Sequence, residues 1–151
     1  MHAELHQRLK TLDSDGAWEM PDDFDWSRAL KEVVRHQPQI ERLTGLPLTL
    51  DDQVQDASFF CELHHSARNP LPGGGVEKVP LLAIRFSTFD RMFTIYGRNV
   101  EESECPPGVI DYLTKQGYKY VALADLRTPY DGKATRGTGG WTWFTRFFDF
   151  L

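Results

Sequence analysis

The chain has 151 residues, of which 40% are hydrophobic and 26% are charged, and its formal net charge is −5. A chain of this length and composition can bury a hydrophobic core, which excludes the disordered and fibrous classes. No apolar run approaches the roughly 18–20 residues that span a bilayer, and residues 1–15 lack the apolar region of a secretory signal. We therefore expect a soluble, cytoplasmic protein that does not bind a membrane.

The acidic side chains are concentrated in the first half of the chain. Residues 1–75 contain thirteen acidic and seven basic side chains, whereas residues 76–151 contain nine acidic and ten basic ones. Nucleic-acid binding depends on basic side chains that neutralise phosphates. This distribution therefore argues against a nucleic-acid partner and favours a basic protein.

Residues 1–16 are predicted to form an amphipathic helical turn. Their apolar side chains have helical spacing, at Leu5, Leu9 and Leu12. The turn is followed by an Asp-Ser-Asp-Gly sequence, which favours a loop. The pattern leaves open whether this segment is mobile or docks onto the rest of the domain.

A longer helix is predicted over residues 27–36. Asp25 or Ser27 is expected to cap its N-terminus, because their side-chain oxygens accept hydrogen bonds from the N–H groups of the first turn. Pro38 lacks the N–H that a helix interior needs, so we expect a break or kink there. A second short turn is then expected to end at Gly45, a residue type that favours the end of a helix.

The middle of the chain is predicted to contain three strands. Alternating β-rich sequence covers residues 57–66, and two further candidates cover residues 81–87 and 92–97. The first two are separated by a loop with two prolines and three glycines at residues 69–75. The last two are separated by residues 88–91, a spacing that suits an antiparallel hairpin.

The last third of the chain is predicted to contain a short helix and two strands. The helix covers residues 109–115 and follows two prolines, which suit a first helical turn. Residues 118–124 and 141–150 are interpreted as strands, the second at the centre of the sheet because aromatic side chains would cover both of its faces. Arg146 in this apolar segment is expected to find a carboxylate or the sheet edge, since a buried unpaired charge is costly.

These elements together predict the α+β fold class. We expect about five strands in a mainly antiparallel sheet, with two or three helices packed on one face. The chain has no internal repeat and no sign of a second core, so residues 1–151 are interpreted as a single domain.

The residues around Cys61 contain the side-chain types of a metal or thiol site. Strand alternation, however, directs Cys61 and His65 to one face and Glu62 and His64 to the other, whereas zinc needs three or four convergent ligands. Cys61 and His65 would also lie about 13 Å apart along a strand, which is too far for a thiol–imidazole pair. We therefore expect no metal and no cofactor, with Cys61 a buried free thiol and Cys105 a second thiol at the surface.

The segment 127–140 is the best candidate for a binding surface. It lacks periodicity over about fourteen residues, and loops of that length in compact domains are often functional. Its glycines resemble an anion-binding loop, but a strand is predicted to follow where a phosphate loop has a helix. Several of its side chains are of types enriched at protein interfaces, and these are the predicted partner-binding residues: Arg127, Tyr130, Asp131, Lys133, Arg136 and Trp141.

The acidic clusters at residues 22–25, 51–56 and 101–104 are expected to be solvated surface or to attract a basic partner. In its size, acidity and α+β pattern the chain is similar to bacterial immunity and antitoxin-type inhibitors. This resemblance implies a non-catalytic binding protein that inhibits a basic enzyme such as a nuclease toxin. Two alternatives are a small enzyme that uses His64 or His65 beside Tyr130, Asp131 and Arg136, and a homodimer formed through an open sheet edge.

Overall fold

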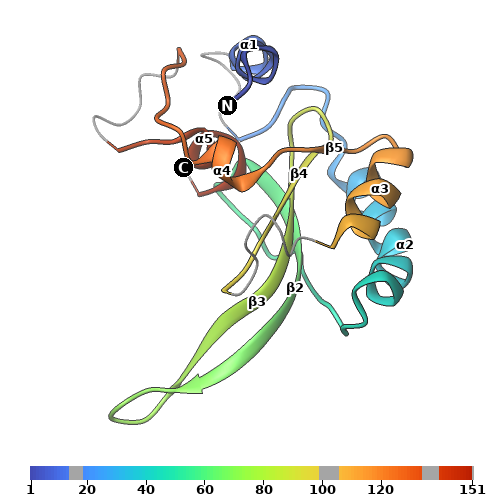
Figure 1. Cartoon of the computed structure of the whole chain (residues 1–151), viewed down its shortest axis with the longest axis vertical. Helices are drawn as coiled ribbons and strands as arrows, with labels where there is room; N and C mark the ends of the chain where they lie inside the picture. The colour runs from blue at the N-terminus through green and yellow to red at the C-terminus, as the bar shows by residue number, and fades with distance from the viewer. Residues whose placement is uncertain (14–18, 99–105, 134–139, 151) are drawn as a thin grey trace.

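The protein is built around a sheet of five strands in the order β1-β2-β3-β4-β5. The computed structural model describes residues 1–13, 19–98, 106–133 and 140–150. The strands are β1 (Thr49–Asp51), β2 (Phe59–Pro70), β3 (Val76–Ser87), β4 (Met92–Tyr96) and β5 (Lys119–Tyr120). The first four pair in antiparallel fashion, and β5 runs parallel to β4. The predicted α+β class with a mainly antiparallel sheet is confirmed (Figure 1).

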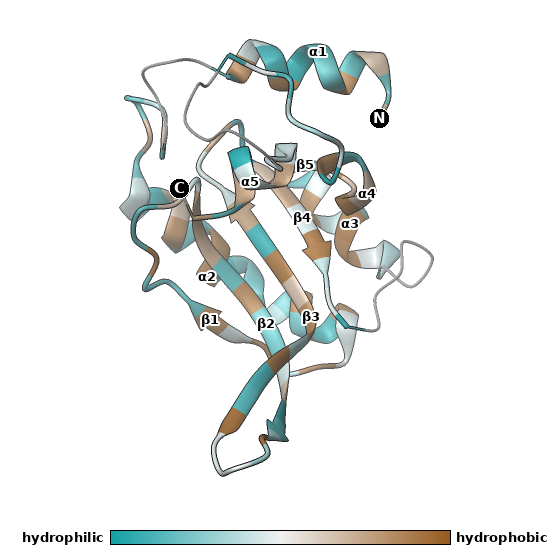
Figure 2. Ribbon diagram, turned by 90° about the vertical axis from the view of Figure 1, so that its left-hand side faces the viewer, coloured by the Kyte–Doolittle hydropathy of each residue, from teal (hydrophilic) through white to brown (hydrophobic). Residues whose placement is uncertain are grey.

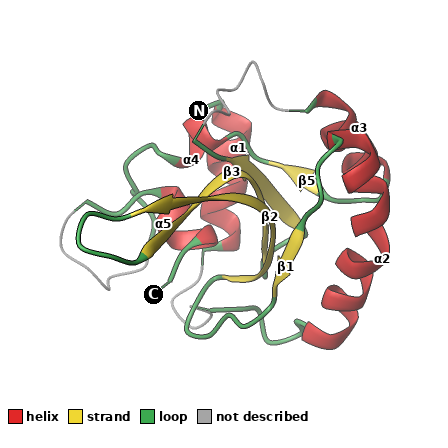
Figure 3. Cartoon of the chain, turned by 90° about the horizontal axis from the view of Figure 1, so that it is seen from below, coloured by secondary structure: helices red, strands yellow, loops and turns green. Residues whose placement is uncertain are grey.

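The described helices lie on both sides of this sheet. They are α1 (Ala3–Leu12), α2 (Trp26–Thr44), α3 (Pro107–Lys115), α4 (Leu123–Leu126) and α5 (Trp143–Phe148). Helices α2 and α3 cover one side, whereas α5 lies on the other (Figures 1 and 3). This arrangement differs from the two or three helices expected on one face. None of the described helices combines the length and apolar character needed to cross a bilayer.

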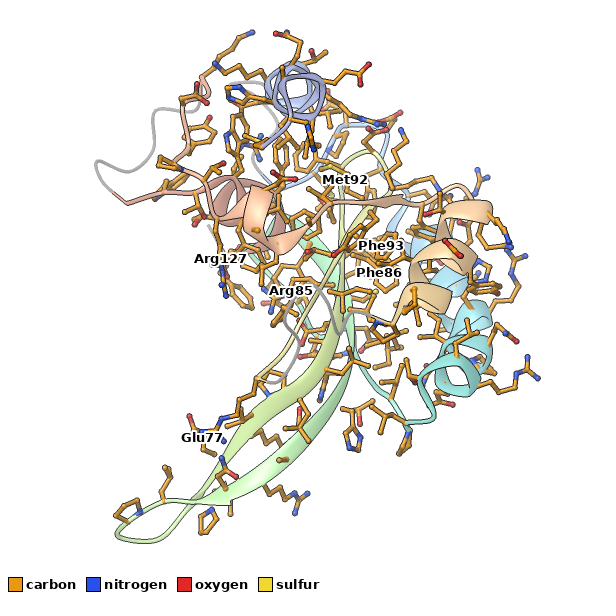
Figure 4. All side chains as sticks on the ribbon, viewed as in Figure 1. Glu77, Arg85, Phe86, Met92, Phe93 and Arg127 are labelled. Atoms are coloured by element: carbon orange, nitrogen blue, oxygen red, sulfur yellow. The ribbon has the colours of Figure 1, made fainter. Side chains whose placement is uncertain are left out.

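The main core lies between the sheet and helices α2 and α3. Phe86 on β3 and Phe93 on β4 are fully buried and stack with their ring centroids 6.2 Å apart. Figure 4 shows both rings on the side of α2 and α3, and Arg85 on the opposite side of β3. The colours of β2 and β3 alternate between polar and apolar residues along much of their length (Figure 2), which is the pattern of half-buried strands. Each buried Phe of this kind contributes about 1.5–3 kcal/mol of stability.

A second apolar cluster joins the two ends of the described chain. Leu9 from α1 packs in one cluster with Met92 from β4 and Trp143 and Phe147 from α5. The rings of Trp143 and Phe147, which lie one helical turn apart, stack at a centroid distance of 5.9 Å. The N-terminal segment, whose docking the sequence left open, is therefore attached in this structure through α1.

The prediction of a central strand at residues 141–150 is wrong, because this segment forms the helix α5. Thr142 caps the helix. Its hydroxyl accepts a hydrogen bond from the Thr145 N–H at 3.2 Å, and the Thr145 hydroxyl accepts one from the Thr142 N–H. A short apolar run is compatible with a buried helix as well as with a buried strand. The reciprocal cap decides in favour of the helix, since it satisfies the N–H groups of the first turn.

Two other boundaries differ from the predictions. Residues 118–124 contain only the two-residue strand β5, after which the chain turns into α4. Helix α2 continues through Pro38 to Thr44 as a single helix, so a break does not occur there. Pro38 lies on the exposed side of the helix, where water can bind the carbonyl group that loses its partner. The expected Asp25 cap and the left-handed Gly45 after the helix are both confirmed.

The hairpin of β2 and β3 extends beyond the rest of the sheet as a projecting arm, which we define as residues 68–78. Figures 1 and 3 show the arm leaving the body of the molecule. Its residues are mostly exposed, including the apolar side chains of Leu71 and Val76 at 46% and 58% exposure. The turn at its tip, within residues 71–75, agrees with the predicted Pro- and Gly-rich loop.

Candidate functional site

The first half of the predicted partner-binding loop folds onto the N-terminal segment. Its anchor is Asp13, which is only 1% exposed. The Arg146 Nε donates a hydrogen bond to Asp13 Oδ1 at 2.7 Å, the Tyr130 hydroxyl donates to Asp13 Oδ2 at 2.6 Å, and the Lys133 N–H donates to the same oxygen at 2.6 Å. We call this arrangement the Asp13 centre. The expectation that Arg146 would find a carboxylate is confirmed.

The Asp13 centre holds a carboxylate in its charged form inside the protein. Burial opposes ionisation of Asp13, but the hydrogen bonds from Tyr130, Arg146 and the Lys133 N–H outweigh it, so the pKa of Asp13 lies below its ordinary value. Gly132 makes this approach possible, because a Cβ atom there would overlap Asp13 Oδ2 and the Tyr130 ring. This part of the loop therefore has a structural role as well as any role in binding.

A second set of contacts attaches the exposed side of the loop to α1. Asp131 accepts a hydrogen bond from His6 at 2.7 Å and forms an ion pair with Lys10 at 2.7 Å. Hydrogen bonds from Lys10 and His6 lower the pKa of Asp131. His6 and Lys10 are one helical turn apart, so both reach the same carboxylate. Sequence reasoning missed them, although their spacing on a predicted helix was a usable signal.

The remaining predicted residues of the loop have different environments. Arg127 is exposed at the end of α4, where Figure 4 labels it, and the Lys133 side chain is also exposed. Trp141 accepts the Tyr130 N–H through its carbonyl group at 2.9 Å, and its ring lies 6.2 Å from the Tyr130 ring. Arg136 and most of the glycine-rich sequence at residues 137–140 lie outside the described residues, as do Cys105 and the acidic cluster at 101–104.

The candidate residues on β2 are separated as strand alternation predicted. Cys61 is a buried free thiol, and burial together with Asp52 and Glu62 raises its pKa well above the ordinary value. Glu62 instead accepts hydrogen bonds from Arg85 and Tyr96. Among the residues that the structure describes, no group of three or more His, Cys, Asp and Glu side chains is placed to hold a metal ion.

His64 and His65, which follow Cys61 on β2, each form a hydrogen bond within the chain. His64 is hydrogen-bonded to the Ser66 hydroxyl at 2.8 Å, and the His65 Nδ1 donates to the Pro47 carbonyl at 3.0 Å. Tyr130 and Asp131, the other described members of the suggested enzyme site, are held by Asp13 and α1. The structure therefore does not assemble these residues around one point.

A more open candidate site lies between the start of α2 and the turn that joins β3 to β4. It is a cavity of about 250 Å³. Three aromatic side chains contribute to its lining: Phe24, Phe60 and Tyr118. Charged side chains also line it, and carboxylates outnumber guanidinium groups among them: Asp23, Asp25, Glu32, Asp90, Arg28 and Arg91. We call this the Arg91 cavity.

The turn beside the Arg91 cavity is held in a costly backbone conformation. The Met92 N–H donates to the Phe89 carbonyl at 3.0 Å, and the two central residues, Asp90 and Arg91, have φ angles of 52° and 55°. Such a type I′ turn favours Asn-Gly, because residues with a side chain lose roughly 1–2 kcal/mol in the left-handed region. Strain of this kind persists only where surrounding contacts enforce it, and it is enriched at functional sites.

Ionic and aromatic contacts enforce this conformation. Arg91 pairs with Glu32 at 2.7 Å, lies 4.3 Å from the centre of the Tyr118 ring and donates to the Gln116 carbonyl at 3.3 Å. Asp90 is held by Lys119 and by Arg8 of α1. The turn is therefore fixed from α2, from β5 and from α1.

The Arg91 cavity combines ionised carboxylates with a neutral aromatic ring. Partial burial opposes ionisation of Glu32, but its hydrogen bond and ion pair with Arg91 outweigh this effect and lower the pKa. Burial raises the pKa of Tyr118 to about 12, so its ring stays neutral. Carboxylates and neutral aromatic rings both attract guanidinium and ammonium groups. Arg91 already binds in this way from within the chain.

Sequence reasoning did not find the Arg91 cavity. The available signal was the Asp90-Arg91 pair at the centre of a predicted hairpin turn, where Asn-Gly or Asp-Gly is expected. Phe24, Glu32 and Tyr118 gave no such signal, because they meet only in the folded chain. Comparison of the chain with protein-family models, with curated proteins and with solved structures found no match.

Proposed function

We propose that this protein is a non-catalytic, cytoplasmic binding protein that recognises a basic protein, and that it inhibits a basic enzyme such as a nuclease toxin by covering its active site. The observation that carries the proposal is the Arg91 cavity, which is lined by carboxylates and aromatic side chains beside a strained turn. A Lys or Arg side chain of the partner is the guest that this chemistry suits.

The charge of the Arg91 cavity supports this choice of guest. Four carboxylates and two guanidinium groups line it. Asp90 pairs with Lys119 and Arg8, and Glu32 pairs with Arg28 and Arg91, so among the described residues Asp23 and Asp25 are the lining carboxylates without an ion pair. Asp23 is exposed and makes no ion pair within the described part of the chain. An incoming cation would therefore meet a carboxylate that has no competing partner. The acidic first half of the chain would also accelerate encounter with a basic protein.

Helix α1 connects the Arg91 cavity with the loop residues predicted to bind a partner. Arg8 of α1 binds Asp90 at the cavity, and His6 and Lys10 of the same helix bind Asp131. In the proposal, the partner covers the cavity first and extends across α1 to the exposed loop residues Arg127 and Asp131.

The test is affinity capture from a lysate of the source cells with three forms of the protein. Wild type is compared with Asp23→Lys, which reverses a charge at the cavity, and with the control Asp22→Lys, which makes the same change at an exposed neighbour outside the lining. We expect wild type and the control to retain the same basic protein and Asp23→Lys to lose it. The retained protein should lose its own activity when the complex forms.

Two results would contradict the proposal. One is that all three forms retain the same proteins, which would show that the Arg91 cavity does not take part in partner recognition. The other is turnover of a small metabolite by the purified protein that Asp23→Lys abolishes and Asp22→Lys preserves, which would favour the enzyme.

The arm favours homodimer formation as a second candidate. A two-stranded hairpin is only marginally stable by itself, and Leu71 and Val76 on the arm are strongly exposed. Pairing of two arms would cover these side chains. Light scattering should then give the mass of a dimer for wild type and of a monomer for Leu71→Lys with Val76→Lys.

A further inference from the structure

A second cavity lies between the start of β1 and the base of the arm. It has a volume of about 320 Å³, and it shares no lining residue with the Arg91 cavity. The basic side chains in its lining come from β2 and β3: His64, His65, Arg68 and Lys78. No Asp or Glu occurs in its lining. The chain has a net charge of −5, so a cavity lined by basic side chains and no acidic ones differs in charge from the chain as a whole.

Two of these cations face each other directly across the sheet. Arg68 on β2 and Lys78 on β3 are antiparallel partners in the register. Like charges placed opposite each other destabilise a pair of strands. Within the part of the chain that the structure describes, neither side chain forms an ion pair with a carboxylate. An anion bound between them would remove this repulsion.

The two histidines beside these cations have different hydrogen-bond roles. His65 donates from Nδ1 to the Pro47 carbonyl at 3.0 Å, and His64 Nδ1 is hydrogen-bonded to the Ser66 hydroxyl at 2.8 Å. Because His65 donates from Nδ1, Nε2 of its neutral ring can only accept a hydrogen bond. His64 can accept from the Ser66 hydroxyl at Nδ1 and then donate from Nε2 to a ligand. Pairing with β1 ends at Thr49 and His64, so beyond this point the outer edge of β2 presents backbone N–H groups as well.

We propose that this cavity binds the phosphate group of a small phosphorylated molecule. Arg68 offers the planar, two-pronged geometry that suits a phosphate, and Lys78 offers a compact positive charge from the opposite strand. The volume suits one or two phosphate groups. The net negative charge of the chain disfavours a long polyanion, whose attraction depends on an extended basic surface.

The test is titration of the full-length protein with pyrophosphate, followed by calorimetry and by backbone amide chemical shifts. Wild type is compared with Arg68→Gln combined with Lys78→Gln, and with the control Arg42→Gln combined with Lys115→Gln, which removes two exposed cations outside the cavity. We expect wild type to bind with shifts centred on His64 to Arg68. Removal of both cavity cations should weaken binding by roughly tenfold or more, whereas the control should retain it.

Folding is monitored separately by thermal unfolding. The double variant at Arg68 and Lys78 should have a Tm equal to or slightly above that of wild type, because the change relieves repulsion between two exposed side chains. If the Tm is unchanged, loss of pyrophosphate binding by this variant is due to the missing cations and not to unfolding.

Three results would overturn the proposal. The first is that wild type fails to bind pyrophosphate. The second is that both double variants weaken binding equally, which would indicate diffuse attraction to positive charge. The third is that a short single-stranded oligonucleotide binds through Arg68 and Lys78 whereas pyrophosphate does not, which would assign the cavity to nucleic acid.

Discussion

The Asp13 centre and the Arg91 cavity use the same chemistry at opposite extremes of burial. Each places an arginine against a carboxylate and over aromatic rings: Arg146 lies 4.7 Å from the Phe147 ring centre, and Arg91 lies 4.3 Å from that of Tyr118. The Asp13 and Arg146 side chains are both 0% exposed, whereas Arg91 and Glu32 are 44% and 20% exposed. Burial therefore distinguishes the two ion pairs. The buried pair of Asp13 and Arg146 stabilises the fold, whereas the exposed pair of Glu32 and Arg91 is free to exchange partners.

The largest effect is expected at the buried member of this comparison. Asp13→Asn keeps the size of the side chain but removes the buried carboxylate that pairs with the Arg146 guanidinium. We expect the free energy of unfolding to fall by about 3–5 kcal/mol, measured by urea denaturation. The matched change at the exposed pair, Glu32→Gln, should cost no more than about 1 kcal/mol. Equal losses at the two pairs would mean that burial does not distinguish them.

The next effect separates the strain of the turn from its contacts. Arg91→Ala removes the ion pair and the cation–π contact but keeps a side chain in the left-handed region, so a loss of about 1–2 kcal/mol is expected. Arg91→Gly removes the same contacts and also relieves backbone strain of roughly 1–2 kcal/mol. Its stability should therefore stay close to that of wild type in the same denaturation assay.

The same pair of variants sharpens the proposed function. If Arg91 holds the cavity in shape for a partner, Arg91→Gly should lose capture of the basic protein even though it unfolds like wild type. A stable Arg91→Gly that captures the partner normally would show that the strained arginine is unnecessary for recognition.

A smaller, pH-dependent effect on stability is expected at His36, whose ring contacts that of Tyr118 in the Arg91 cavity. His36 is buried and hydrogen-bonded to the Tyr112 hydroxyl at 2.8 Å. Burial, followed by the charge of Arg35, lowers its pKa below 6.5, although Glu32 acts in the opposite direction. The unfolded chain therefore takes up a proton at higher pH than the folded protein, and stability should fall as the pH decreases below about 6.5.

Denaturation of wild type and His36→Gln between pH 7.5 and pH 5, a range set around the ordinary histidine pKa of about 6.5, measures this effect. The variant should show a shallower decline over that range. If the two curves run parallel, a different group causes the decline.

The smallest effect is expected on the exposed side of the loop. Asp131→Asn removes the ion pairs with His6 and Lys10, but Asp131 is 52% exposed. Exposed ion pairs contribute about 0.2–1 kcal/mol. The free energy of unfolding of the variant should therefore fall by no more than about 1 kcal/mol, and the decrease should be smaller in high salt. A loss as large as that of Asp13→Asn would place the attachment of the loop at its surface and not at the Asp13 centre.

Local signals in the sequence were sufficient for several elements. The Asp25 cap, the Gly45 end of α2 and the hairpin turn at residues 88–91 depend on neighbouring residues only, and the structure confirms each of them. The burial of Cys61 was expected because free cysteines tend to be interior, and it is confirmed. The turn at residues 88–91 was placed correctly, but its strain became visible only through the φ angles of Asp90 and Arg91.

The errors have a common cause in short apolar segments. Residues 141–150 are apolar enough for either a strand or a helix, and the cap at Thr142 decided between them. β1 has three residues and β5 has two, so neither is long enough to give a clear pattern. The strands predicted at residues 57–66, 81–87 and 92–97 correspond to β2, β3 and β4. The bounds of β4 agree to within one residue, whereas β2 and β3 extend beyond their predicted bounds into the arm.

The sequence by itself determined the α+β class, the antiparallel hairpins, the buried thiol and the need of Arg146 for a carboxylate, because these follow from residue spacing and from the cost of burying an unpaired charge. Only the tertiary structure decided that this carboxylate is Asp13, which lies 133 residues away, and that Glu32, Arg91 and Tyr118 meet at one cavity. Contacts between distant segments depend on how whole helices and strands pack. This packing is determined by many residues together, so no short sequence pattern reveals it.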